Sequence, residues 1–135
     1  MTPSALPDGD PAPEDGRLPA DVGRDLGRRP LAAYVHVPFC ASRCGYCDFN
    51  TYTAADLGGA PGTSRDAYLD ALAREIALAD GVLGAGRPPL STVFFGGGTP
   101  TLLAASELGG ILGRLRDSFG LTPDAELTTE ANPDS

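Results

Sequence analysis

Two stretches decide the fold: residues 31–47 read LAAYVHVPFCASRCGYC, and residues 91–100 read STVFFGGGTP. In both, a short apolar run enriched in β-branched and aromatic residues leads directly into a loop, which is typical of a buried strand. We expect the first strand over residues 32–37, ended by Pro38, and the second over residues 91–95.

Helical patterns follow each of these strands, because apolar residues recur there at three- and four-residue spacing. The first helix is expected to run from about Ser64 to about Asp80, with Thr63 or Ser64 as N-cap, and the second over Ala105–Phe119. A third strand is expected over residues 125–131. The resulting β-α-β-α-β order predicts an α/β fold with a parallel sheet and right-handed crossovers.

Residues 1–30 differ in character from the rest of the chain. They hold six of its 13 prolines, and their few large apolar residues show no periodicity, so they are expected to form a disordered tail. Residues 31–135 are expected to form the N-terminal part of a larger α/β domain or barrel. A parallel sheet needs both faces covered, and a sheet of three strands looks incomplete.

Composition and charge exclude several classes of function. The chain of 135 residues has 18 acidic and 10 basic side chains, which gives a formal charge of −8, so an overall basic surface for nucleic acid is absent. No apolar run approaches the roughly 20 residues of a membrane span, and the N-terminus lacks the pattern of a secretory signal. We therefore expect a cytoplasmic protein with neither a membrane span nor a nucleic-acid partner.

The strongest chemical signal is a group of cysteines, Cys40, Cys44 and Cys47, which are the three cysteines of the chain. An odd number of closely spaced thiols is a poor disulfide framework and indicates a metal or redox site. Three thiolates suit an iron–sulfur cluster that leaves one iron open, whereas structural zinc takes four ligands. His36 could complete a zinc site, although its place in a strand favours a hydrogen-bonded core role. A cluster, a zinc site and unligated redox thiols all remain open.

A second signal is the run GGGTP at residues 96–100. Because glycine has no Cβ, such a run lets a ligand approach the backbone, although a tight turn would explain part of it. The run matches neither a dinucleotide fingerprint nor a P-loop. Glu130, at the expected end of the third strand, could bind ribose hydroxyls or be a solvated strand-end carboxylate. Ligands of α/β sheets and barrels bind where the strands end, so the cysteines, the glycines and Glu130 are expected at one rim.

Four segments together resemble the radical S-adenosylmethionine (SAM) enzymes, and among them the coproporphyrinogen oxidase-like branch: residues 34–40 (YVHVPFC), the C-x3-C-x2-C loop, residues 96–101 (GGGTPT) and residues 130–133 (EANP). The resemblance covers residues 31–135 and implies that they form the N-terminal part of a partial (β/α) barrel. It also implies that Cys40, Cys44 and Cys47 ligate a 4Fe–4S cluster whose open iron takes the amino and carboxylate groups of SAM. Six residues would contact SAM: Tyr34, Tyr46, Gly97, Gly98, Thr99 and Glu130.

One position bears on the choice of function within this branch. The oxygen-independent coproporphyrinogen III dehydrogenases carry a further cysteine two residues after the third, and here that place holds Phe49. The difference favours the members of the branch regarded as haem chaperones, which implies haem, haem-accepting proteins and an electron donor as partners. A dehydrogenase of porphyrin biosynthesis, which would use a 5′-deoxyadenosyl radical made from SAM, is the alternative. A structural zinc module is the third interpretation.

Overall fold

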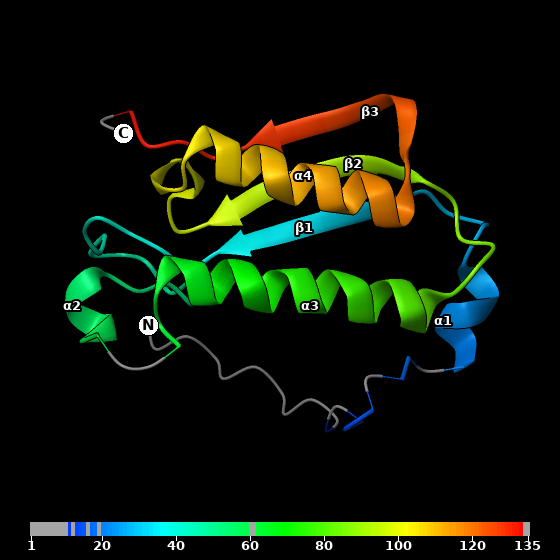
Figure 1. The fold of residues 1–135 in the computed structure, drawn as a ribbon, viewed down its shortest axis with the longest axis horizontal. Helices are drawn as coiled ribbons and strands as arrows, with labels where there is room; N and C mark the ends of the chain where they lie inside the picture. The colour runs from blue at the N-terminus through cyan, green and yellow to red at the C-terminus, as the bar shows by residue number, and fades with distance from the viewer. Residues whose placement is uncertain (1–10, 12, 16, 19, 60–61, 134–135) are drawn as a thin grey trace.

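The computed structural model describes residues 11–133 except for residues 12, 16, 19, 60 and 61. Three strands form one parallel sheet in the order β1-β2-β3, with helices in the connections between them (Figure 1). This arrangement confirms the predicted α/β fold. In chain order the elements are α1 (Ala20–Asp25), β1 (Leu31–Val37), α2 (Ala54–Leu57), α3 (Arg65–Leu83), β2 (Leu90–Gly97), the 3-10 helix η1 (Pro100–Leu102), α4 (Ala105–Phe119) and β3 (Leu121–Thr129).

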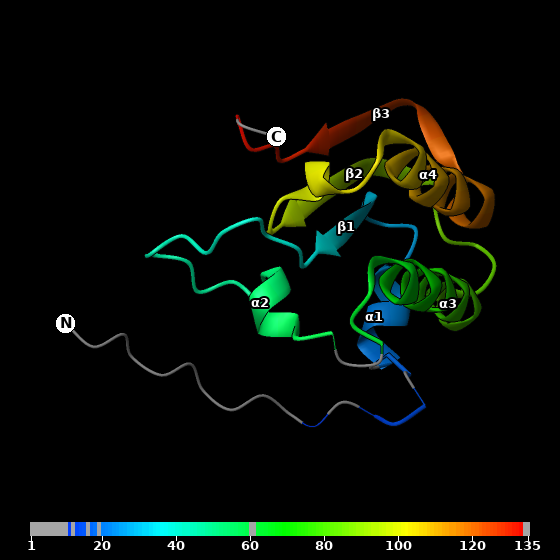
Figure 2. The ribbon, with the colours of Figure 1, turned by 60° about the vertical axis from the view of Figure 1, so that its left-hand side comes forward.

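The core lies between the sheet and the two long helices, α3 and α4, which cover the same face of the sheet (Figures 1 and 2). Side chains alternate along the strands, so one set of β1 and β2 side chains points toward the helices. The core consists mainly of these strand residues with apolar residues from α3 and α4: Val35, Val37, Val93, Phe95, Ile76, Ile111 and Leu115. Neither long helix covers the other face, which carries Tyr34 and Phe94.

The boundaries of the long helices follow from local sequence. Ser64 is the N-cap of α3, because its Oγ accepts a hydrogen bond from the Ala67 amide over 3.1 Å, as predicted. The helix continues past its expected end to Leu83. The other long helix, α4, spans the predicted residues and stops at Gly120, whose φ of 73° suits glycine. No helix in the described part of the chain has the length and apolar character needed to cross a membrane.

The third strand differs from the prediction: β3 spans Leu121–Thr129 rather than residues 125–131. Proline cannot donate a ladder hydrogen bond, so Pro123 is an unusual residue inside a strand. In the structure β3 pairs with β2 on one side, and the register between them shifts between the Leu90–Leu121 and Thr92–Glu126 pairs. Pro123 lies within this irregular segment, where a missing donor breaks no ladder.

The segment before β1 also departs from the expectation of a disordered tail. Residues 20–25 form the short helix α1, and a backbone hydrogen bond of 3.0 Å from Arg28 N to Asp25 O follows it. Arg24 lies in the last turn of α1, where a cation complements the helix dipole. The structure therefore places one short helix within the segment expected to be a tail, while residues 1–10, 12, 16 and 19 lie outside the described part of the chain.

The largely buried side chain of Arg87 links α3 and α4 at the end of the sheet where β2 begins. Its guanidinium forms an ion pair with Asp80 of α3 and donates to the Ser118 carbonyl of α4 over 2.6 Å. The same group lies 4.8 Å from the centre of the Phe119 ring, within the range of a cation–π contact. One side chain therefore joins the C-terminal ends of both long helices just before β2 begins.

Candidate functional site

The C-terminal ends of the three parallel strands meet at one edge of the sheet, and a cavity of about 590 Å³ lies there. We call it the rim cavity. Eight of the nine residues predicted to bind a metal or SAM line it: Cys40, Cys44, Tyr46, Cys47, Gly97, Gly98, Thr99 and Glu130. Residues from three separate segments are thus brought to one place, as the rule for strand ends predicts.

The cysteine loop, residues 38–52, leaves the end of β1 and returns beside it. Cys40 N donates to the Tyr52 carbonyl over 3.0 Å, and Tyr52 N donates to the Pro38 carbonyl over 2.7 Å. Cys44 is exposed, whereas Cys40 and Cys47 are partly buried, and all three are free thiols. Among the described residues no three His, Cys, Asp or Glu side chains are grouped as ligands of a single ion.

The glycine loop after β2 lies directly against the cysteine loop. Gly98 N donates to the Val37 carbonyl over 2.8 Å, and Thr99 N donates to the Phe39 carbonyl over 2.7 Å. A Cβ on Gly98 would lie 2.4 Å from the Phe39 carbonyl oxygen and 2.9 Å from Cys40 Sγ. The glycine is therefore required by the close approach of the two loops, which a tight turn by itself would not explain.

Glu130 is tied to the glycine loop at the end of β3. Its Oε2 accepts a hydrogen bond of 3.0 Å from Gly97 N, and its own amide donates to the Phe95 carbonyl over 2.9 Å. A Cβ on Gly96 would lie 3.0 Å from the Tyr34 ring and 3.3 Å from Glu130 Oε2. Tyr34, the one predicted residue that does not line the rim cavity, therefore lies beside Glu130 on the uncovered face of the sheet.

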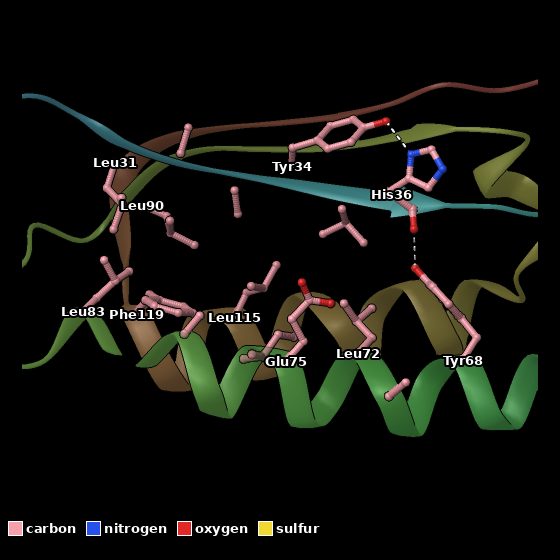
Figure 3. A pocket seen from close by; sticks show the side chains of 16 residues that line it. Leu31, Tyr34, His36, Tyr68, Leu72, Glu75, Leu83, Leu90, Leu115 and Phe119 are labelled. Carbon is pink, nitrogen blue, oxygen red and sulfur yellow. Dashed lines mark hydrogen bonds between the residues drawn. The ribbon is translucent and has the colours of Figure 1, made fainter. Parts of the chain in front are cut away.

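His36 connects β1 to the return of the cysteine loop. Its Nε2 donates to the Asn50 carbonyl over 2.8 Å, because a carbonyl oxygen can only accept, and its Nδ1 therefore accepts from the Tyr34 hydroxyl over 2.9 Å. Figure 3, drawn around a second cavity between β1 and α3, shows Tyr34 and His36 on the face of β1 away from α3. Both ring nitrogens have protein partners, so the structure favours the hydrogen-bonded role over zinc ligation.

The backbone of His36 is held from the helix side. Tyr68 of α3 donates its hydroxyl hydrogen to the His36 carbonyl over 2.9 Å. Burial raises the pKa of Tyr68 to about 12, with smaller contributions from the charges of Glu75 and Tyr34. Tyr68 therefore stays protonated and able to donate at neutral pH.

Sequence reasoning did not identify Arg43, Thr51 and Asp56, whose hydrogen bonds connect the cysteine loop to α2. We call these hydrogen bonds the brace. Arg43 donates through Nη2 to the Thr51 carbonyl over 3.0 Å and to Asp56 Oδ2 over 3.2 Å. Asp56 also accepts hydrogen bonds of 2.8 Å from the backbone and the hydroxyl of Thr53, which caps the short helix α2. A T-x-x-D pattern at residues 53–56 was the available signal, because it resembles a capping box.

These contacts make the brace sensitive to acid. The backbone and hydroxyl hydrogen bonds from Thr53, followed by that from Arg43, lower the pKa of Asp56 from 3.8 to about 2. A carboxyl group with a depressed pKa stabilises the folded state above its ordinary pKa, and this contribution is lost as the pH falls through the folded value. The stabilisation by Asp56 is therefore fully present above about pH 4 and disappears toward pH 2.

We expect Asp56→Asn to loosen the cysteine loop at neutral pH, because an amide oxygen binds the Arg43 guanidinium less strongly than a carboxylate does. Hydrogen exchange by mass spectrometry should show lower protection of residues 40–52, with the rates corrected for intrinsic exchange. Asp117→Asn is the matched control, because Asp117 pairs with Arg116 on the exposed surface of α4. Equal protection of the loop in wild type and Asp56→Asn would show that the brace does not stabilise it.

Comparison with known proteins finds a family model and several similar proteins that match this chain. The family model described as "Radical SAM superfamily" matches residues 34–134. The chain is 54% identical over 107 residues to "Heme chaperone HemW" of Mycobacterium tuberculosis, covering 79% of this chain and 26% of that protein. It is 39% identical over 105 residues to "Oxygen-independent coproporphyrinogen III oxidase" of Escherichia coli, covering 78% of this chain and 21% of that protein.

A solved structure is also similar to this chain. The structure titled "Coproporphyrinogen III oxidase (HemN) from Escherichia coli is a Radical SAM enzyme" has a TM-score of 0.65 and 37% identity to this chain. The match covers 78% of this chain and 23% of that one. The chain thus spans about a quarter of the length of the relatives it matches.

Proposed function

Because this chain belongs to the radical SAM superfamily, we propose that its rim cavity binds a 4Fe–4S cluster and SAM, and that the protein serves as a haem chaperone. The donor set fits the cluster, since three free thiols from one loop line the same cavity. His36 has both ring nitrogens engaged by Tyr34 and Asn50, so the thiols have no competing nitrogen ligand from that side chain. One open iron is the expected result.

The observation that carries the proposal is the contact between the two loops. Gly98 leaves room for Cys40 Sγ, which would lie only 2.9 Å from a Cβ at this position. The thiols that would hold the cluster therefore lie directly beside the glycine loop that would bind SAM. When both groups are bound, they supply the one-electron chemistry, and the protein's part is to hold and orient them.

Three residues at or near the cavity would have different roles in binding SAM. Glu130 has one oxygen held by the Gly97 amide, so its negative charge is fixed at the cavity, where it suits the positive charge of SAM. Tyr46 is 89% exposed at the same cavity and offers an aromatic ring to the adenine. Tyr34 lies beside Glu130, and we propose that it contacts SAM from the uncovered face of the sheet.

A chaperone role is favoured over porphyrinogen oxidation by the residue at position 49. Phe49 lines the rim cavity where the dehydrogenases carry an additional cysteine. Its side chain is 63% exposed, so it does not serve as core packing in the described structure. The proposed partners are haem, haem-accepting proteins and a one-electron donor.

The proposal extends to the organisation and location of the protein. Residues 31–135 would be the N-terminal part of a longer core domain, which agrees with relatives about four times as long. The outer edge of β3, which has no strand beside it among the described residues, would then pair with a further strand. A cytoplasmic location agrees with clustered free thiols, which persist in reducing compartments.

The test uses the full-length protein, reconstituted with iron and sulfide without oxygen. We expect acid-labile sulfide, haem binding detected by Soret absorbance, and no formation of protoporphyrinogen IX from coproporphyrinogen III, SAM and a reductant. The Escherichia coli oxygen-independent coproporphyrinogen III oxidase is the positive control for the assay. Protoporphyrinogen IX formed at a rate comparable to the control would overturn the chaperone role, and stoichiometric zinc without sulfide would overturn the cluster.

A further inference from the structure

Thr51 lies near the end of the cysteine loop, just before Tyr52, whose backbone pairs with residues 38–40. It is 3% exposed, and its Oγ1 lies 3.8 Å from Cys47 Sγ, within reach of a hydrogen bond to sulfur. We propose that Thr51 is a positioning residue whose hydroxyl donates a hydrogen bond to the Cys47 thiolate and raises the reduction potential of the cluster. This inference rests on the proposed function, since it requires Cys47 to ligate the cluster.

The direction of this hydrogen bond follows from the chemistry of the two groups. As a free thiol, Cys47 could donate or accept, but a metal-bound thiolate has no proton and can only accept. The Thr51 hydroxyl has one hydrogen, and its other acceptor within reach is the Phe49 carbonyl at 3.5 Å, at the limit for oxygen. The negative charge of the thiolate therefore makes sulfur the better acceptor.

The hydroxyl is held in place from several sides. Thr51 N donates to the Phe49 carbonyl over 2.8 Å, and its own carbonyl accepts from Arg43. Cys47 N donates to the Cys44 carbonyl over 3.1 Å, which fixes the turn that carries the sulfur. Burial of Thr51 limits the access of water, so a solvent molecule does not readily replace the hydroxyl if it is removed.

The effect on the cluster is electrostatic. Reduction transfers one electron from an external one-electron donor to the cluster, and no bond forms or breaks in the protein. The added negative charge is shared with the ligand sulfurs, so a donor on Cys47 stabilises the reduced state more than the oxidised state. Loss of the donor should lower the equilibrium constant of reduction about tenfold, which for one electron corresponds to about 59 mV.

The experiment compares Thr51→Val, which is close in shape and lacks the hydroxyl, with Thr51→Ser, which keeps it. Midpoint potentials are measured on the full-length protein without SAM by EPR-monitored potentiometry, together with iron and sulfide content. We expect a more negative potential in Thr51→Val and a potential near that of wild type in Thr51→Ser. Thr51→Ala is a second variant without the hydroxyl, and it should shift in the same direction.

The outcomes separate this inference from the proposed function. Equal potentials in wild type, Thr51→Val and Thr51→Ala at equal sulfide content would overturn the role of Thr51 while leaving the cluster intact. A shift in Thr51→Ala without one in Thr51→Val would assign the effect to packing and would also overturn it. Wild-type protein without labile sulfide would instead overturn the proposed function.

Discussion

Cys44→Ala should abolish assembly of the proposed iron–sulfur cluster. The cluster has three protein ligands in the proposed site, and the chain has no other cysteine to replace the missing one. Cys44 is exposed, so its truncation creates no cavity in the core and should not change the fold. Iron and acid-labile sulfide per chain, measured after anaerobic reconstitution, should fall to background together with the absorbance of the cluster.

The control for this experiment is Ser42→Ala, a truncation in the same loop at another exposed residue of the rim cavity. It should retain the wild-type iron and sulfide content, because a serine hydroxyl is not a ligand of the proposed cluster. A Cys44→Ala protein with wild-type sulfide content would show that Cys44 is not a ligand and that the assignment of the cysteine loop is wrong.

Gly98→Ala should weaken SAM binding at least tenfold, or about 1.4 kcal/mol, and should also reduce the cluster content. The added Cβ would lie 2.4 Å from the Phe39 carbonyl oxygen, which belongs to the backbone and cannot turn away as a side chain can. It would also lie 2.9 Å from Cys40 Sγ. The glycine loop and the cysteine loop must therefore separate, and both ligand groups lose part of their site. Anaerobic calorimetry with SAM measures the affinity.

Gly109→Ala provides the matched control, because a Cβ at Gly109 on α4 would meet no atom within 4 Å. Alanine is a better helix former than glycine, so this variant should be as stable as wild type or up to about 1 kcal/mol more stable. It should bind the cluster and SAM normally. Unchanged SAM affinity and sulfide content in a folded Gly98→Ala protein would mean that the loop contact does not control binding.

Local patterns were sufficient for the elements whose boundaries are set by nearby residues. The cap at Ser64 and the stop at Gly120 depend on side chains and backbone conformations within one helical turn, so both could be predicted. The start of β3 could not, because it depends on how Pro123 fits a register shift against β2. The short helix α1 was missed because its sequence has no apolar periodicity.

The candidate site, too, could be predicted from the sequence only in part. The convergence of Cys40 and Gly98 could be predicted in outline, because parallel strands end at the same edge of a sheet. The places of Arg43 and Thr51 could not, because they follow from the return of the chain beside β1 through hydrogen bonds between Tyr52 and residues 38–40. That return is a tertiary contact, and no spacing of residues along the chain encodes it.

The pairing of β3 with β2 on one side has a consequence for handling this protein in the laboratory. Among the described residues the outer edge of β3 has no strand beside it, so its backbone groups can pair with another molecule. Pro123 and Asp124 discourage such pairing in the first half of the strand, whereas Leu127, which is 51% exposed, and the two threonines after it favour β structure. A preparation of these residues alone should therefore aggregate through β3, at a rate that rises with concentration.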